Sequence, residues 1–271
     1  MKVPFTKTHG QKNDFLLTPA AGAPESDPAE FAKAICDRHS GIGADGWYLV
    51  SPGDAECAAA VRLINSDGSG SEVSGNGTRC VAAYLLQNGL EADRITIRTG
   101  AGLKSMRVLE RRGSEWYFEM NMGCVYYPGE VQQQLPLAST RVDATVLNVG
   151  NPQCAVFVDN FDFDWRSMGG AIEWHEWFPQ RTNVSFVHAL DRHTIEVRIW
   201  ERGAGETLSS GTGSTGAAFA ALTRGLVDSP VRVLTPAGPL DLRLEGEELM
   251  LTGPAAVIGS GEFDWEADVN E

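Results

Sequence analysis

Two short segments combine a serine with glycines in a pattern that could bind an anion. Residues 74–80 read Ser-Gly-Asn-Gly-Thr-Arg-Cys, and residues 210–216 read Ser-Gly-Thr-Gly-Ser-Thr-Gly. A run of small, apolar residues follows each segment, which predicts a helix with Ser74 or Ser210 as its N-cap. Backbone N–H groups at a helix start are unpaired and carry the positive end of the helix dipole. Each segment therefore predicts an anion site.

Polar side chains in predicted turns could complete such a site. Four are asparagines and two are charged: Asn13, Asn65, Asn151, Asn183, Glu201 and Arg202. Any one of them could simply form a turn or remain a solvated charge. Asn65 and Glu201, however, are separated by 136 positions, as are Ser74 and Ser210. Their matching places favour a shared role in ligand binding.

This constant separation indicates an internal duplication. With the 136-residue offset and no gap, Val61–Ile64 aligns with Val197–Trp200, and Thr99 aligns with Thr235. The offset persists through a strand-like segment, a glycine loop, a helix and a second strand, which chance matches among 30 glycines would not produce. We interpret the chain as two halves of one architecture, with equivalent loops facing a shared cleft.

The elements predicted in each half are many strands and few helices. Asp27 is the expected N-cap of a helix over 28–37, another helix is expected over 165–174, and the polar stretch 128–136 is expected to connect the halves. This pattern predicts an α+β fold of two pseudo-symmetric domains, each a sheet wrapped around a central helix. The expected domains are 1–119, with 256–271 returning to it, and 120–255.

Composition limits the classes of function. The 271 residues suit two domains, no apolar run could span a membrane, and no signal peptide is visible, so a cytoplasmic protein is expected. A net charge of −14 disfavours nucleic acid and anionic membranes as partners. Five cysteines without a CxxC motif argue against a disulfide framework and a zinc site.

Several segments together resemble the diaminopimelate epimerase family. They are Asn13-Asp14-Phe15, Asn65-Ser66-Asp67-Gly68-Ser69, Gly75–Cys80, Gly150-Asn151-Pro152, Arg181-Thr182-Asn183 and Glu201–Thr207. The resemblance extends from about residue 5 to about residue 254. It implies an isomerase, a homodimer in lysine biosynthesis, that inverts the α-carbon of LL- or meso-diaminopimelate or a close analogue. Two facing residues would exchange the α-proton, and neither a cofactor nor a metal is implied.

The resemblance also assigns roles to individual residues. Asn13, Asn65, Asn151, Asn183 and Arg202 would hold the distal amino-acid end of the substrate, with Glu201 beside its amine. An arginine can bind a carboxylate through two hydrogen bonds. The reacting carboxylate would bind the backbone N–H groups of Gly75, Asn76, Gly211 and Thr212. These dipoles would stabilise the negative charge that develops when the α-proton leaves.

The chain departs from the family at the two catalytic positions, where the family has cysteine and this chain has Ser74 and Ser210. A serine hydroxyl is a far weaker acid than a thiol and needs a neighbouring base. The candidates for that base are Glu72, Glu206, Asp67 and His175. The chain could isomerise diaminopimelate or another amino acid through its serines or a neighbour. It could instead bind the ligand without efficient turnover, or carry an engineered Cys-to-Ser pair.

Overall fold

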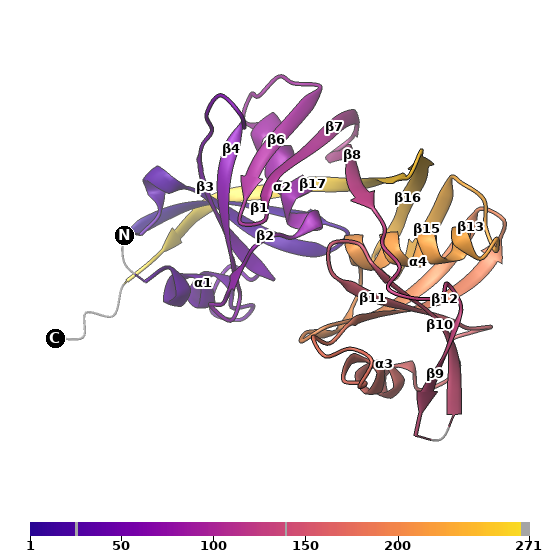
Figure 1. Ribbon diagram of the computed structural model, residues 1–271. Coiled ribbons are helices and arrows are strands. Elements are labelled where there is room, and N and C mark those ends of the chain that lie inside the picture. Colours follow the sequence, from indigo (N-terminus) through magenta and orange to yellow (C-terminus); the bar gives the residue numbers. More distant parts are fainter. Residues whose placement is uncertain (25–26, 139, 267–271) are drawn as a thin grey trace. The chain divides into compact units, whose positions relative to one another are not determined.

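A computed structural model describes residues 1–24, 27–138 and 140–266 (Figure 1). The chain divides into two compact units, one made of Met1–Glu119 with the chain from Pro254 onward, the other of Met120–Gly253. Strands greatly outnumber helices, and each unit holds one helix of 13 residues packed against its strands. The predicted α+β fold of two pseudo-symmetric domains, each with a sheet around a central helix, is confirmed.

The first unit is built around the helix α2 (Gly75–Gln87), which packs against β1, β2 and β6 (Figure 1). Its sheet joins β2 to β3 and β4 to β6 in parallel, while β1–β2, β3–β4 and β6–β7 are antiparallel. The elements are β1 (Lys2–Gly10), β2 (Asn13–Pro19), η1 (Ala20–Gly22), α1 (Pro28–Cys36), β3 (Gly46–Pro52), β4 (Ala59–Asn65), β5 (Gly70–Ser71), α2, β6 (Arg94–Thr99) and β7 (Gly102–Arg112). Two long strands, β8 (Glu115–Cys124) and β17 (Glu248–Asp264), continue from one unit into the other.

The second unit repeats this order around the helix α4 (Gly211–Thr223). Its parallel pairs are β11–β12 and β13–β15, and β12–β13 and β15–β16 are antiparallel, as in the first unit. The elements are β9 (Gln133–Leu137), β10 (Thr140–Asn148), β11 (Pro152–Phe157), α3 (Trp165–Glu173), β12 (Asn183–Asp191), β13 (Thr194–Glu201), β14 (Gly205–Thr207), α4, β15 (Val231–Thr235) and β16 (Gly238–Glu245).

The stretch 128–136 is not only a connector, because β9 begins within it. Leu135 is fully buried in a hydrophobic cluster of the second unit, and β9 pairs with β10. The prediction was wrong at this point because the neighbouring glutamines made the stretch look polar, although Leu135 and Leu137 of β9 both pack in that cluster. In contrast, α1 begins at Pro28 as predicted, and Asp27 caps it by accepting a hydrogen bond from the N–H of Glu30.

The duplication extends to side-chain hydrogen bonds. The Thr99 hydroxyl donates to the carbonyl of Gly102 (2.9 Å), and the Thr235 hydroxyl donates to the carbonyl of Gly238 (2.8 Å). Both threonines cap the turn that follows the central helix and one strand. The two threonines are 136 residues apart and make the same hydrogen bond in the same turn, which confirms the internal repeat.

Small side chains allow each central helix to be enclosed by strands. Ala82 and Ala83 of α2, and Ala217, Ala218, Ala220 and Ala221 of α4, are all buried. A helix that is apolar around its circumference is stable only when it is buried on all sides. Strands can approach such a helix closely because an alanine adds little beyond the backbone.

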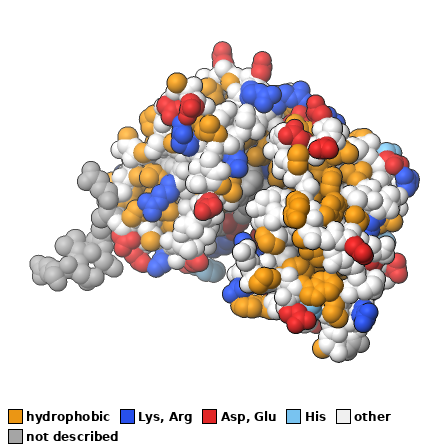
Figure 2. Space-filling view, in the orientation of Figure 1, with side chains coloured by type: hydrophobic (Ala, Val, Ile, Leu, Met, Phe, Trp, Pro, Cys, Tyr) orange, Lys and Arg blue, Asp and Glu red, His pale blue; other side chains and the backbone are white. Residues whose placement is uncertain are grey.

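The surface and the thiols give little sign of other sites. Figure 2 shows acidic and basic side chains scattered between hydrophobic ones over the visible face of each unit. All five cysteines are free thiols, and Cys124 is the exposed one. Burial raises the pKa of Cys36, Cys80 and Cys154 to about 12 in each case, which keeps these thiols protonated and unreactive. No helix in the described parts of the chain is both long and apolar enough to span a membrane.

Candidate active site

The two serines occupy the predicted N-cap positions. Ser74 has an extended backbone (φ −127°, ψ 125°), and its hydroxyl oxygen accepts a hydrogen bond from the N–H of Gly77 (3.1 Å). Ser210 matches it (φ −139°, ψ 127°) and accepts from the N–H of Gly213 (3.3 Å). Each cap satisfies the third N–H of its helix, so the first two remain available for a ligand.

The first residue of each helix is a glycine that packing does not require. A Cβ added to Gly75 or Gly211 would meet no heavy atom within 4 Å. By contrast, a Cβ on Gly77 would lie 2.2 Å from the hydroxyl of Tyr48, so that glycine is needed for packing. The open space beside Gly75 and Gly211 leaves room for a ligand at the two helix starts.

An asparagine from a strand start contacts the second residue of each central helix. In the first unit, the Nδ2 of Asn76 donates to the Oδ1 of Asn13 (3.5 Å). In the second unit, the Nδ2 of Asn151 donates to the Oγ1 of Thr212 (3.3 Å). The structure therefore brings four of the predicted site residues to the two helix starts in matching arrangements.

Arg79 supports the first of these contacts and was given no role by sequence reasoning. Its side chain is fully buried, and its Nη2 donates to the Oδ1 of Asn76 (2.5 Å). Burial lowers the pKa of Arg79 to about 10, which still leaves the guanidinium charged at neutral pH. Because the Asn76 oxygen is engaged, its amide nitrogen must face Asn13.

A charge network holds Asn13 from the other side. The Nδ2 of Asn13 donates to Asp45 (2.6 Å), and Arg38 bridges Asp45 (2.7 Å) and Asp14 (2.7 and 3.2 Å). Lys7 lies 3.3 Å from the second oxygen of Asp14. Burial by itself raises the pKa of Asp14, but hydrogen bonds and charges from Arg38 and Lys7 outweigh it, so the pKa is lowered. Asp14 therefore stays ionised and fixes the start of β2.

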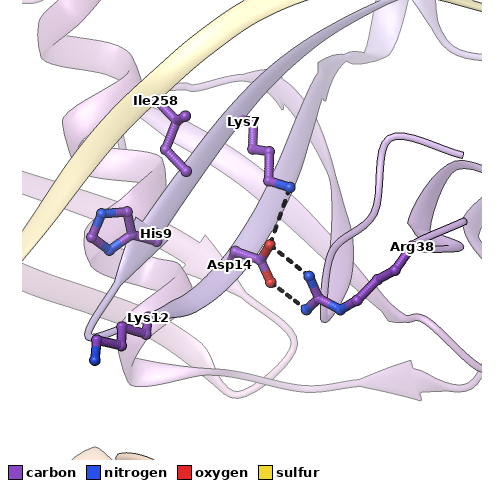
Figure 3. Close-up of a pocket in the computed structure, with 6 residues that line it drawn as sticks. All are labelled: Lys7, His9, Lys12, Asp14, Arg38 and Ile258. Atoms are coloured by element: carbon purple, nitrogen blue, oxygen red, sulfur yellow. Dashed lines mark hydrogen bonds and ion pairs between the residues drawn. The ribbon is translucent and has the colours of Figure 1, made fainter. Parts of the chain in front are cut away.

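Figure 3 shows Lys7 and Arg38 pointing toward Asp14 from different segments. These residues line a cavity of about 390 Å³ together with His9, Lys12 and Ile258. Lys7 is paired with Asp14, and Arg38 is paired with both Asp14 and Asp45. The network therefore serves to position β2 and Asn13.

In the second unit, a carboxylate lies beside the cap serine. Glu201, the last residue of β13, lies close enough to Ser210 for the hydroxyl to act on its carboxyl group. Burial raises the pKa of Glu201, and the nearby Ser210 hydroxyl only partly offsets this. A carboxylate with a raised pKa beside a hydroxyl forms a pair that can accept and return a proton. In the first unit, Asn65 occupies the equivalent position and donates to Ser69 instead (2.9 Å).

The bases that sequence reasoning considered have other contacts. Glu206 receives two hydrogen bonds from Arg166 (2.6 and 2.8 Å), and Asp67 accepts from the N–H and hydroxyl of Ser69 (2.8 and 2.6 Å). The Nδ1 of His175 accepts a hydrogen bond from the backbone N–H of Trp177 (3.2 Å). Glu72 is exposed. Sequence reasoning had placed Glu201 beside a ligand amine and missed it as the partner of Ser210.

Asn183, the first residue of β12, contacts Arg202 in the turn after β13. The Oδ1 of Asn183 accepts from the N–H of Arg202 (2.9 Å), and its Nδ2 donates to the carbonyl of Pro152 (3.2 Å). The exposed guanidinium of Arg202 donates to the carbonyl of Gln180 (3.0 Å) and has no carboxylate partner among the residues that the structure describes. Asn183 thus acts as a scaffold, and Arg202 retains donors for an anionic ligand.

Known proteins are similar to this chain in sequence and in fold. The family model for diaminopimelate epimerase matches residues 5–127 and 145–258. A diaminopimelate epimerase of Pelotomaculum thermopropionicum is 37% identical over 278 residues, covering 96% of this chain and 99% of the relative. One of Methanococcus maripaludis is 35% identical, with coverage of 96% and 99%.

The fold comparison agrees. A solved structure described as a predicted epimerase from Pseudomonas aeruginosa has a TM-score of 0.73 at 15% identity, covering 97% of this chain and 100% of that one. This likeness concerns the fold alone. The residues matched by the family model, by contrast, include both Ser-Gly segments and the turn that carries Glu201 and Arg202. The chain therefore belongs to the diaminopimelate epimerase family of isomerases.

Proposed function

We propose that the chain epimerises the α-carbon of diaminopimelate, interconverting its LL and meso forms without a cofactor. The observation that carries this proposal is the half-buried carboxyl group of Glu201 close to Ser210, the N-cap of α4. It supplies a proton acceptor beside an anion site, which is what removal of a proton next to a carboxylate requires. The names of the relatives support the choice of substrate.

The substrate's reacting carboxylate binds to the free N–H groups of Gly75, Asn76, Gly211 and Thr212. Ser210 takes the α-proton while its own proton passes to Glu201, and the electron pair of the broken C–H bond is delocalised into the carboxylate. Ser74 then gives a proton to the opposite face of the carbon. Glu201 releases its proton to solvent and Ser74 regains one from solvent, so the net proton count is unchanged. The scheme requires the two serines to reach opposite faces of one α-carbon.

The helix starts lower the barrier because negative charge accumulates on the bound carboxylate during the reaction. Dipoles that already point at this charge stabilise it without reorganising. The proton transfers are less well supported by neighbouring groups than carboxylate binding is. Ser210 has Glu201 as its base, whereas the position equivalent to Glu201 in the first unit is the non-titrating Asn65. Turnover through Ser74 is therefore the slower half of the reaction.

Binding should depend on the ligand's distal carboxylate. Arg202 has unused donors, and a hydrogen bond to a charged group contributes roughly 1.5–3 kcal/mol. Diaminopimelate should therefore bind more tightly than lysine, which lacks that carboxylate. Isothermal titration calorimetry of both ligands measures this difference, and Arg202→Ala should remove it. Equal affinities of the unaltered chain for lysine and diaminopimelate would exclude this substrate.

A ligand-binding protein without efficient turnover is a second candidate, and the serines at both cap positions favour it. Such a binding protein would have the same ligand site as the epimerase, and only its proton transfers would be slow or absent. The two functions therefore predict the same calorimetric result and different rates of α-hydrogen exchange.

A further inference from the structure

We propose that Glu173 is a positioning residue that fixes the turn carrying Glu201 and Arg202 for recognition of the substrate's distal carboxylate. This inference rests on the function proposed above. Glu173 is the last residue of α3, and its side chain is only 6% exposed. Neither the repeat nor the family motifs gave it a role.

The two carboxylate oxygens of Glu173 hold the turn at both ends. Oε2 accepts from the indole N–H of Trp200 (2.8 Å), and Oε1 accepts from the backbone N–H of Gly203 (2.9 Å). Trp200 directly precedes Glu201, and Gly203 directly follows Arg202. The two hydrogen bonds therefore bracket the two residues that the proposed mechanism uses. Arg181, 3.5 Å from Oε1, partly neutralises the carboxylate.

The helix α3 is shaped to receive Trp200. A Cβ on Gly169 of α3 would lie 2.9 Å from the side chain of Trp200. Any larger residue at this position would force Trp200 or the helix to shift. The close contact between α3 and Trp200 therefore depends on a glycine at position 169.

The first unit shows that the fold itself does not need this carboxylate. The helix α1, like α3, has nine residues, and its last residue, Cys36, aligns with Glu173 when Ile35 is aligned with Ile172. The residue equivalent to Trp200 is Ile64 under the 136-residue offset. Cys36 and Ile64 lie in one hydrophobic cluster. A buried charge is costly unless it is well paired, so its presence only in the unit that carries Arg202 indicates a functional purpose.

Glu173→Gln tests the proposal with little change in shape. Trp200 and Gly203 donate to different oxygens of Glu173, and glutamine replaces one of these oxygens by an NH2 donor, so one of the two hydrogen bonds is lost. In calorimetry on the full chain, the Kd for diaminopimelate should rise about tenfold, since one hydrogen bond to a charged group is worth roughly that factor. The Kd for lysine, which does not use Arg202, should change much less. In the Arg202→Ala background, Glu173→Gln should add no further loss.

Glu247→Gln is the matched control, because it makes the same change in an exposed turn of the same unit and should alter neither Kd. Trp200→Phe removes only the indole donor and provides a second test if Glu173→Gln does not fold. Unchanged diaminopimelate affinity in both variants would overturn the proposal, as would equal losses for both ligands, which indicate a structural role. If the unaltered chain does not prefer diaminopimelate, the proposed function itself fails.

Discussion

Replacing Ser74 and Ser210 together by cysteine should raise the rate of diaminopimelate epimerisation by at least about a hundredfold, the lower end of what positioned acid–base catalysis contributes. A thiol has a reference pKa of about 8.5, which falls further at a helix N-terminus, so a thiolate base is accessible near neutral pH. A serine hydroxyl ionises far less readily. Circular dichroism follows the change of configuration in both proteins side by side.

Ligand affinity should survive this exchange. The reacting carboxylate is proposed to bind backbone N–H groups, which serine and cysteine present equally, so the calorimetric Kd should remain the same. Ser66→Cys adds a thiol to an exposed turn and is a control for thiol chemistry elsewhere. If the double variant is no faster and the serine protein is already an efficient isomerase, positions 74 and 210 do not transfer the protons.

Glu201→Gln should lower turnover of the unaltered serine protein by about a hundredfold or more, because it removes the proton acceptor of Ser210. The base must be ionised, so activity should rise as the pH rises through the pKa of Glu201. Burial raises that pKa above the ordinary value of 4.5. The acidic limb of the pH–rate profile should therefore lie above that value and disappear in Glu201→Gln.

The melting temperature of Glu201→Gln shows whether its loss of turnover comes from the missing base or from unfolding. A carboxyl group whose pKa is raised by folding stabilises the folded state below its unfolded pKa, and this contribution is lost as the pH rises through the folded pKa. Glu201→Gln should therefore melt at an equal or higher temperature at neutral pH. If Glu206→Gln abolishes turnover while Glu201→Gln does not, the assignment of the base is wrong, since Glu206 is paired with Arg166.

The repeat made much of the architecture predictable. A serine followed by glycines and small residues fixes a helix start locally, and Ser74 and Ser210 are the N-caps of equal helices. Asp27 as a cap is also a local feature that depends only on its neighbours. Such elements can be predicted because the interactions that form them lie within a few residues.

The side-chain partners could not be predicted in this way. Glu201 reaches Ser210 only after β13 and β14 have paired and reversed the chain, as the register Glu201↔Gly205 shows. Glu173 reaches the same turn from a helix almost thirty residues earlier, and its contact depends on how α3 packs. One signal was present in the sequence: a charged residue at the position where the other half has Cys36.

The most direct test of the proposed function is α-hydrogen exchange in deuterated water. The unaltered chain is incubated with LL-diaminopimelate, the isomers are separated on a chiral column, and their mass is measured. Two-sided proton transfer predicts that the meso product carries one solvent deuterium at the inverted carbon, and that lysine remains unlabelled. Meso product without deuterium, or bound diaminopimelate with neither exchange nor inversion, would contradict the account.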